Sequence, residues 1–364
     1  MEKIRVLHVI TGMGSGGAEA FIMNMFRNID NKQVVFDFLL RSEENMYEDE
    51  IKSLGGKIYI MPPYPNKLVS NYIQTKKFLK EHKEYKIIHV HGNAFIYISA
   101  LLIARLKNVP CRIMHSHNTD AGRPIYRIVH KVNKIFMNFL VTDRFACSDK
   151  AGKWMFGNRS FLKVNNGIDV DKFVYNEEIR SKVRKKYNID KDTVLIGHVG
   201  RFLKVKNHSY IIDIFNEYIK QNKNSKLMLI GDGPEFETIN DKVKGLGLKD
   251  KVIFLSKINN VNEMMQAMDI FLFPSIHEGL ALVSVEAQTA GLPCIMSDTI
   301  TNESIITNLV EVKSIDLEPR EWAISIDKNM KKYTRKSMKK IIEDNGYSSK
   351  YSAKILENFY KAHS

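Results

Sequence analysis

Short apolar segments rich in Val, Ile and Phe alternate along the chain with longer segments of helical periodicity. This alternation is typical of parallel sheets whose strands are joined by crossover helices. The expected strands are residues 5–10, 35–40, 57–60, 86–91, 111–115 and 144–148, then 194–200, 226–231, 252–255, 269–275 and 292–297. We therefore expect an α/β protein with two doubly wound parallel sheets, one in each half of the chain.

The boundary between the halves is expected near Asp171. The segment NGIDVDKF, residues 166–173, contains a turn-forming Asn-Gly pair, and a charged helical segment follows it before the next strand. At 364 residues the chain also exceeds the usual size of one domain. We expect domains at residues 1–171 and 172–347, with a final helix in residues 348–364 that packs back on the first domain.

Three features bear on the cellular compartment. The N-terminal apolar run stops at Gly12, which is too early for a signal peptide. The longest apolar run, residues 94–104, is about half the length of a membrane span, so it is expected to form a buried helix. The three cysteines lie far apart, in or beside expected strands, as free thiols of a reducing compartment do. We expect a cytoplasmic protein.

The formal net charge of +14 points to anionic partners or an anionic surface. Residues 123–136 place bases beside an apolar stripe on one expected helix: Arg123, Arg127, Lys131 and Lys134 with Ile125, Ile128, Val132 and Ile135. Such a helix can lie on a membrane, and a solvated helix face is the alternative. A second basic cluster, residues 328–340, is expected to be solvated. No nucleic-acid-binding motif accompanies the charge, so nucleic acid is not an expected partner.

Ligands of open α/β sheets bind beyond the carboxyl ends of the strands, so the site is expected in the cleft between the two sheets. The candidate loops at strand ends are HSHN, GRFLKVK, GDGPE, HEGL and GMGSGG. The last of these, residues 12–17, opens a helix, and its backbone amides can approach a phosphate. It matches a dinucleotide fingerprint, but the second strand lacks the acidic residue at its end. A phosphate site of another kind is favoured over a dinucleotide site or an empty tight turn.

Two other loops carry charge. Arg201 and Lys206 follow a strand, and both cations can reach one diphosphate. Farther on, Gly279–Leu282 leads into a helix whose first amides we expect to be unpaired and able to bind phosphate. Glu286, about two turns into that helix, can accept from two ribose hydroxyls, and Glu278 can address a different hydroxylated ring. The alternative is that Glu278 caps the helix while Glu286 lies on its solvent face.

Histidines close two neighbouring strands, with His89 and His91 on one and His115 and His117 on the next. His115 and His117 are expected on opposite faces if the strand continues, and neither a carboxylate nor a cysteine accompanies them at ligand spacing. We therefore expect no metal, and we expect structural roles for His91 and His117.

Together these motifs resemble the retaining, nucleotide-sugar-dependent glycosyltransferases of family 4, which have the GT-B fold. The matching segments are GGAE, HSHN, NGID, GRFxxxKN, GDGPE and EGLALVSVEAQTAGLP, in the family's order across residues 12–293. The GT-B fold implies two Rossmann-like domains facing a central cleft, the first for the acceptor and the second for the donor. One departure is Leu280-Ala281, where many members carry Phe-Gly, and it leaves the sugar preference open.

The resemblance implies a role for each matching residue. Glu286 would bind the ribose and Glu278 a hydroxyl of the donor sugar, while Arg201 and Lys206 would neutralise the leaving diphosphate. His115 matches the family's active-site histidine near the transferred sugar. The other donor contacts that it implies are Gly16, Gly17, the backbone of Ile258, Gly279, Leu280, Ala281 and Leu282.

The resemblance also implies a reaction and its partners. A hexose or N-acetylhexosamine would move from a nucleotide sugar, expected to be a UDP-sugar, with retention of anomeric configuration and without a metal or other cofactor. The basic helix at residues 123–136 favours a lipid-linked saccharide acceptor and peripheral contact with an anionic membrane, as in the branch that makes capsule and exopolysaccharide. A nucleotide-sugar epimerase of the same fold and a non-catalytic sugar-nucleotide-binding protein are the alternatives.

Overall fold

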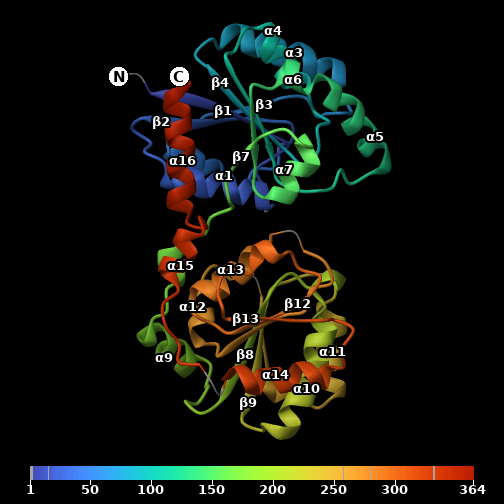
Figure 1. Cartoon of the computed structure of the whole chain (residues 1–364), viewed down its shortest axis with the longest axis vertical. Helices are drawn as coiled ribbons and strands as arrows, with labels where there is room; N and C mark the ends of the chain where they lie inside the picture. The colour runs from blue at the N-terminus through green and yellow to red at the C-terminus, as the bar shows by residue number, and fades with distance from the viewer. Residues whose placement is uncertain (1–2, 15, 257, 279, 331–332) are drawn as a thin grey trace. The chain divides into compact units, whose positions relative to one another are not determined.

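The computed structural model of the chain describes residues 3–14, 16–256, 258–278, 280–330 and 333–364. It divides into two compact units, residues 1–167 with 348–364 and residues 168–347 (Figure 1). The first break lies a few residues before the expected position near Asp171, because the short helix α8 (Val170–Phe173) packs on helices of the second unit.

The first unit contains a seven-stranded parallel sheet in the order β3-β2-β1-β4-β5-β6-β7. Its strands are β1 (Ile4–Ile10), β2 (Val34–Leu40), β3 (Ile58–Ile60), β4 (Ile87–Gly92), β5 (Cys111–Ser116), β6 (Asp143–Ala146) and β7 (Leu162–Lys163). The order in which strands are added reverses between β1 and β4: β2 and β3 lie on one side of β1, and β4 to β7 lie on the other. The loops that follow β1 and β4 therefore run to opposite sides and leave room for a ligand.

Helices cover both faces of this sheet. One face packs against α1 (Gly17–Asn28), α2 (Glu48–Ser53) and the C-terminal helix α16 (Ser349–Ala362). The other packs against α3 (Leu68–Glu81), α4 (Ser99–Leu106), α6 (Met137–Leu140) and α7 (Asp149–Phe156). Helix α5 (Pro124–Asn133) and the 3-10 turn η1 (Lys134–Phe136) connect β5 to α6. Helix α16 therefore belongs to the first unit although it follows the second in the chain.

The second unit repeats the same winding with six parallel strands in the order β10-β9-β8-β11-β12-β13. These are β8 (Val194–Val199), β9 (Ser225–Ile230), β10 (Val252–Leu255), β11 (Ile270–Phe273), β12 (Cys294–Ser297) and β13 (Val310–Lys313). The predicted α/β class with two doubly wound parallel sheets is confirmed.

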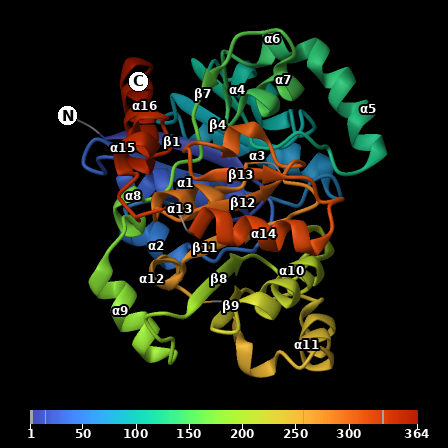
Figure 2. The same ribbon diagram turned by 60° about the horizontal axis from the view of Figure 1, so that its bottom comes forward.

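Helices of the second unit also lie on both faces of its sheet (Figure 2). One face packs against α10 (His208–Gln221), α11 (Phe236–Gly245) and α14 (Pro319–Met330). The other packs against α9 (Glu177–Lys186), α12 (Val261–Ala267) and α13 (Leu282–Thr289), while α15 (Lys339–Asp344) joins α8 in a smaller apolar cluster. Short 3-10 turns are η2 (Lys204–Lys206), η3 (Lys249–Lys251) and η4 (Asn302–Ser304).

Several predicted elements differ from the structure. The buried helix expected across residues 94–104 begins only at Ser99, because the preceding segment turns and the Phe95 amide donates to His130 Nδ1 at 2.9 Å. The helix expected across 123–136 is divided into α5 and η1. Edge strands β7 and β13 are too short or too polar to have been predicted. Among the described residues, none of the helices combines the length and apolarity needed to span a bilayer.

Candidate active site

The loops that follow β8 and β11 are held together at the carboxyl edge of the second sheet. The amide of Ile276 donates to the carbonyl of Val205 at 2.8 Å, and Asn207 Nδ2 donates to the carbonyl of Pro274 at 3.2 Å. Asn207 adopts a left-handed conformation with φ of 59°, which Asn tolerates better than most residues. These bonds bring the two predicted charged loops side by side.

Lys206 and Glu278 form an ion pair at this edge. Lys206 Nζ lies 2.5 Å from Glu278 Oε1, and the two side chains are 18% and 17% exposed. The ammonium also lies 5.0 Å from the centre of the Phe273 ring. A Cβ on Gly200 would lie 3.4 Å from Lys206 Cδ, so the lysine stem passes within van der Waals reach of this glycine. The structure therefore pairs Lys206, expected at the diphosphate of a donor, with Glu278, expected at a hydroxyl of its sugar.

Arg201 follows β8, in the same loop as Lys206, and its side chain is exposed. The GDGPE loop after β9 packs against its backbone: the Phe202 amide donates to the Asp232 carbonyl at 2.7 Å. Gly231 has φ of +151°, and a Cβ there would lie 2.1 Å from the Gly200 carbonyl oxygen. The close approach of the two backbones therefore requires glycine, and it brings the GDGPE and GRFLKVK loops together.

The start of helix α13 differs in part from expectation. The Ala281 amide donates to Ser304 Oγ at 3.3 Å and the Leu282 amide donates to the Leu280 carbonyl at 3.1 Å, so the prediction of unpaired amides is wrong for these two groups. Leu280 and Leu282 are half-buried and pack against an apolar cluster. Gly279 lies outside the described residues. A phosphate would have to replace the bonds of both amides to use them.

Glu286 is the fifth residue of α13, just over one turn from its start rather than two. Burial raises the pKa of its carboxyl to about 8. Glu286 is half-buried, at the border between the buried and the solvent-facing side of the helix. Ile258, in the loop after β10, packs against the same apolar cluster as Ala281. The second unit thus carries a half-buried acid, an ion pair and an exposed guanidinium on the loops and helix that follow β8 and β11.

The glycine loop of the first unit opens α1, with Gly16 at the N-cap and Gly17 as the first helical residue. Carboxylates lie against this loop: a Cβ on Gly16 would lie 2.3 Å from Glu19 Oε2, and one on Gly14 would lie 2.4 Å from Glu44 Oε1. Glu19 in the first turn interacts favourably with the helix dipole. A phosphate at this loop would meet the negative charge of the Glu19 carboxylate, which lies against Gly16.

His115 lies on β5 and is fully buried. Its ring stacks on that of His117 with centroids 4.3 Å apart, so the expectation of opposite faces is wrong, since residues two apart on a strand share a face. Together with His8, His89 and His91, these two residues form a layer of imidazoles inside the first unit. In two groups of three, one ring nitrogen of each histidine lies within 4.8 Å of the other two: His8, His89 and His91, and His91, His115 and His117. Burial lowers the pKa of all five rings, which are therefore neutral near pH 7: His8, His89, His91, His115 and His117.

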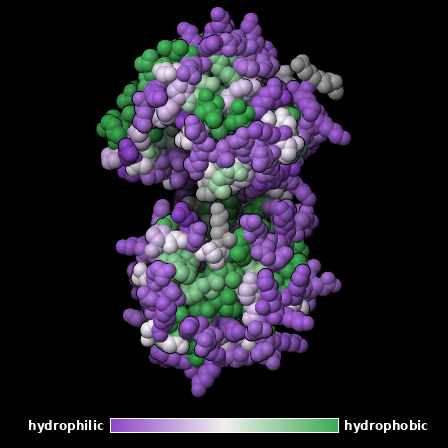
Figure 3. All heavy atoms as spheres, turned by 180° about the vertical axis from the view of Figure 1, so that it is seen from behind, coloured by the Kyte–Doolittle hydropathy of each residue, from purple (hydrophilic) through white to green (hydrophobic). Residues whose placement is uncertain are grey.

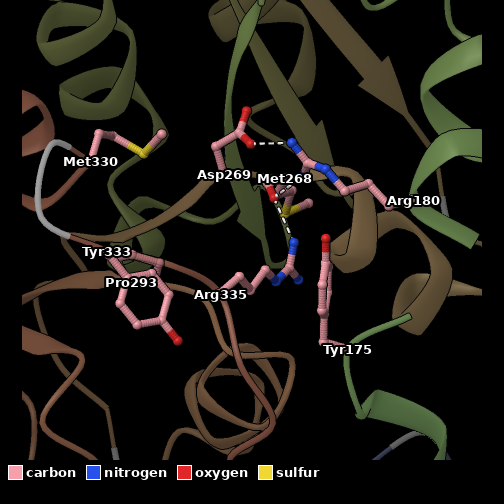
Figure 4. Close-up of a pocket in the computed structure, with 8 residues that line it drawn as sticks. All are labelled: Tyr175, Arg180, Met268, Asp269, Pro293, Met330, Tyr333 and Arg335. Atoms are coloured by element: carbon pink, nitrogen blue, oxygen red, sulfur yellow. Dashed lines mark hydrogen bonds and ion pairs between the residues drawn. The ribbon is translucent and has the colours of Figure 1, made fainter. Parts of the chain in front are cut away.

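A separate cavity of about 130 Å³ lies at the amino ends of β11 and β12, away from the strand-end loops. Figure 4 shows the guanidinium groups of Arg180 and Arg335 directed toward Asp269 and Met268. Arg335 is half-buried and donates to the carbonyls of four residues, Met265, Gln266, Met268 and Ala290. The expectation of a solvated basic cluster is wrong at Arg335, which cross-links main-chain segments and has a structural role.

Comparison with known proteins identifies the family. The profile described as "Glycosyltransferase Family 4" matches residues 15–172, and the one described as "Glycosyl transferases group 1" matches residues 179–349. The chain is 33% identical to EpsF of Bacillus subtilis (strain 168), assigned as a glycosyltransferase, over 98% of this chain and 96% of EpsF. The chain is a family 4-type glycosyltransferase.

Other similarities extend over most of this glycosyltransferase. It is 25% identical to the Escherichia coli UDP-Gal:alpha-D-GlcNAc-diphosphoundecaprenol alpha-1,3-galactosyltransferase, over 86% of both chains. It is 26% identical to the capsular polysaccharide biosynthesis glycosyltransferase CapH of Staphylococcus aureus, over 89% of this chain and 90% of CapH. Anabaena Alr3699/HepE, solved in complex with UDP, shares the fold with a TM-score of 0.74 and 16% identity, covering 99% of this chain and 95% of that one.

We expect UDP binding near pH 7 to release about one proton from Glu286. With its pKa near 8 the carboxyl is protonated at pH 7, and two ribose hydroxyls would donate to the ionised form and lower that pKa. Calorimetry in buffers of different protonation enthalpy measures the release, which should disappear in Glu286→Gln and persist in the exposed control Glu318→Gln. Tight UDP binding to the wild type without proton release would contradict the predicted ribose contact.

The raised pKa of Glu286 also predicts how its contribution to folding stability changes with pH. Because the folded-state pKa of Glu286 is raised, its contribution to stability is complete below the unfolded value of 4.5 and is lost as the pH rises through about 8. Glu286→Gln should therefore gain thermal stability relative to the wild type near pH 9 but not near pH 4.

Proposed function

We propose that this glycosyltransferase of polysaccharide biosynthesis moves a hexose or N-acetylhexosamine from a UDP-sugar to a lipid-linked saccharide, with retention and without a metal. The observation that carries the proposal is the Lys206–Glu278 pair at the carboxyl edge of the second sheet, with the exposed Arg201 in the same loop as Lys206. A diphosphate leaving group needs fixed positive charge when no metal supplies it, and two cations at one strand edge provide that charge.

The proposed reaction uses no side-chain nucleophile. The acceptor hydroxyl attacks the anomeric carbon on the face from which the diphosphate leaves, and a phosphate oxygen takes its proton. Arg201 and Lys206 stabilise the charge that develops on the diphosphate. A sugar hydroxyl that donates to Glu278 shares the carboxylate with Lys206, so the ion pair links recognition of the sugar to neutralisation of the leaving group.

Two relatives support a UDP-sugar donor and a lipid-linked acceptor. The name of the E. coli relative specifies UDP-galactose and a diphosphoundecaprenol-linked sugar, and HepE was solved with UDP. Glu286, half-buried on the helix that follows β11, supports binding of a ribose, because its pKa is raised and hydroxyl donors would stabilise the ionised carboxyl.

The exposed surface of α5 in the first unit supports peripheral contact with the inner face of the cell membrane. Apolar side chains of α5 and the following turns are at least half exposed: Ile125, Ile128, Val132, Ile135, Phe136 and Phe139. Figure 3 shows green apolar atoms at the edge of the first unit, where α5 lies. Arg123, Arg127 and Lys131 are exposed beside this stripe, while Lys134 Nζ donates to the Trp154 carbonyl. Exposed apolar and basic residues on one helix suit an anionic bilayer.

An acceptor-dependence assay tests the proposed function against its alternatives. Incubation with UDP-sugars should release UDP only when a lipid-linked saccharide is present, and the sugar should appear on that saccharide with its anomeric configuration unchanged. An epimerase would release UDP or change the sugar without an acceptor. A sugar-nucleotide-binding protein would be stabilised by the donor against thermal unfolding without turnover.

We expect Arg201→Ala and Lys206→Met each to lower kcat about 10²–10³-fold, since each removes charge that acts on the leaving diphosphate. Methionine keeps an apolar stem but leaves the Glu278 carboxylate without its ion pair, so thermal unfolding of this variant must show that it is folded under the assay conditions. Lys204→Ala, an exposed change in the same 3-10 turn, is the matched control and should retain wild-type turnover. Activity within a few-fold of wild type in both test variants would remove these cations from the mechanism.

Transfer should continue in excess chelator, because Arg201 and Lys206 supply the charge that a divalent ion would otherwise provide. The measurement compares initial rates in chelator, in added magnesium and in added manganese. Loss of activity in chelator with recovery on addition of either metal would contradict the metal-free mechanism.

Reversing charge in Arg127→Glu/Lys131→Glu should weaken binding to anionic vesicles and slow transfer to a lipid-linked acceptor, but leave transfer to a short soluble acceptor unchanged. Each base near an anionic surface contributes about 1 kcal/mol, and salt should mimic the change. The control Lys223→Glu/Lys249→Glu makes the same net change in charge on exposed residues of the second unit. Wild-type binding that is absent, or unaffected by salt and by the substitutions, would make α5 a solvated helix.

A further inference from the structure

The histidine layer of the first unit is ordered as two hydrogen-bonded chains. In one, the Tyr360 hydroxyl of α16 lies 2.6 Å from His89 Nδ1, and His89 Nε2 lies 3.1 Å from His115 Nδ1. In the other, His8 Nδ1 lies 2.8 Å from His91 Nε2, and His91 Nδ1 lies 2.8 Å from His117 Nε2. The first chain is the more informative, because it begins at a phenol and ends at the residue that resembles the family's active-site histidine.

Hydrogen-bond chemistry gives the proton positions along the first chain. Tyr360 is fully buried, and burial raises its pKa well above the usual range, so its hydroxyl keeps a proton and needs an acceptor. His89 Nδ1 is the acceptor within reach. A neutral imidazole carries one proton, so His89 must hold it on Nε2 and donate it to His115 Nδ1. His115 then holds its own proton on Nε2.

The chain ends in a donor that has no protein partner. Among the described residues, His115 Nε2 is buried and makes no hydrogen bond. An orphan N–H in a buried position costs free energy unless a ligand atom accepts from it. An oxygen of the proposed sugar or diphosphate is such an acceptor.

A metal site explains this layer less well. The hydrogen-bonded nitrogens are 2.8–3.1 Å apart, whereas two imidazole nitrogens on one tetrahedral zinc ion lie about 3.3 Å apart. Neither of the two histidine groups includes a carboxylate or a thiolate, so a divalent ion would remain uncompensated in a buried layer.

We propose that Tyr360 and His89 are positioning residues that hold His115 as its Nε2–H tautomer, so that the ring offers a hydrogen-bond donor, not an acceptor, to an oxygen of a bound substrate. The role of His115 toward substrate rests on the proposed function, whereas its tautomer is a property of the protein alone. Tyr360 lies 271 residues after His89 in the sequence. The C-terminal helix therefore supplies one end of a hydrogen-bonded chain whose two histidines lie on β4 and β5.

Nitrogen NMR of the full chain, labelled with ¹⁵N-histidine, tests the tautomer without any substrate. Two-bond proton–nitrogen correlations distinguish protonated from unprotonated ring nitrogens, and His115→Gln assigns the signals of His115. We expect a protonated Nε2 and an unprotonated Nδ1 in His115 of the wild type. Tyr360→Phe should shift both nitrogens toward averaged values, whereas Tyr351→Phe should not, since Tyr351 lies on the same helix with 56% of its surface exposed. A wild-type His115 protonated on Nδ1, or zinc bound by the layer, would overturn the proposal.

A double-mutant cycle tests whether the tautomer matters for transfer. Tyr360→Phe should lower kcat roughly three- to tenfold, the loss expected when one hydrogen bond no longer selects the tautomer, while the KM of the donor changes little. In a His115→Gln background the same change should have no further effect, because a side-chain amide donates without tautomers. Equal losses in both backgrounds would show a general effect of Tyr360 on packing and overturn the positioning role.

The two sets of measurements separate failure of this proposal from failure of the proposed function. Absence of sugar transfer with every donor and acceptor would remove the proposed function and leave the NMR result to decide the tautomer. Tyr360→Phe retains the aromatic ring, so it should remain folded, and thermal unfolding of the variant checks this directly. An averaged tautomer with unchanged kcat would confine the chain to a structural role.

Discussion

The arrangement of the second unit depends on the close approach of two backbone segments, the loops that follow β8 and β9. The Gly231 Cα lies so near the Gly200 carbonyl that no side chain fits between them. This approach fixes the direction in which the chain leaves β8, and with it the positions of Arg201 and Lys206. Hydrogen bonds from Asn207 and Ile276 then attach the loop after β11, which carries Glu278. Main-chain geometry therefore places the charges, and the side chains need only extend from it.

The charges of this region differ in how far water stabilises them. Lys206 and Glu278 are largely withdrawn from solvent but neutralise each other, whereas Arg201 is exposed and remains available to an anion. Glu286 is half-buried and its pKa is raised, so its ionised form is disfavoured until hydrogen-bond donors bind to it. A ligand that provides hydroxyls for Glu286 and an anion for Arg201 would therefore relieve one cost and gain a favourable charge interaction at once. The site is arranged for a ligand that is polar at both ends.

Much of this organisation was predictable from the sequence because parallel strands deliver functional loops to one edge of a sheet. Short apolar runs gave the strand positions, and the residues that follow them gave the candidate loops. Local pattern could not show that the Ala281 and Leu282 amides have partners, because one acceptor belongs to Ser304 and the other to a tight turn. It also could not show that Arg335 binds main-chain carbonyls, since its four acceptors lie 45 to 70 residues earlier in the chain. The edge strands β7 and β13 were missed because β7 is very short and the apolar residues of β13 alternate with charged residues, whereas the edge strands β3 and β10 were predicted.

The histidine layer shows where periodicity and tertiary structure must be combined. Residues two apart on a strand share a face, so His89 with His91 and His115 with His117 should have been placed together from the pattern alone. Tyr360, the partner that orders His89 and His115, is separated from them in sequence by the whole second unit. Packing of α16 on α1 and β1 brings the Tyr360 hydroxyl to His89, and a buried phenol needs an acceptor for its proton. In the proposed tautomer, the proton positions of His89 and His115 therefore depend on the C-terminal helix, whereas those of the His8–His91–His117 chain do not.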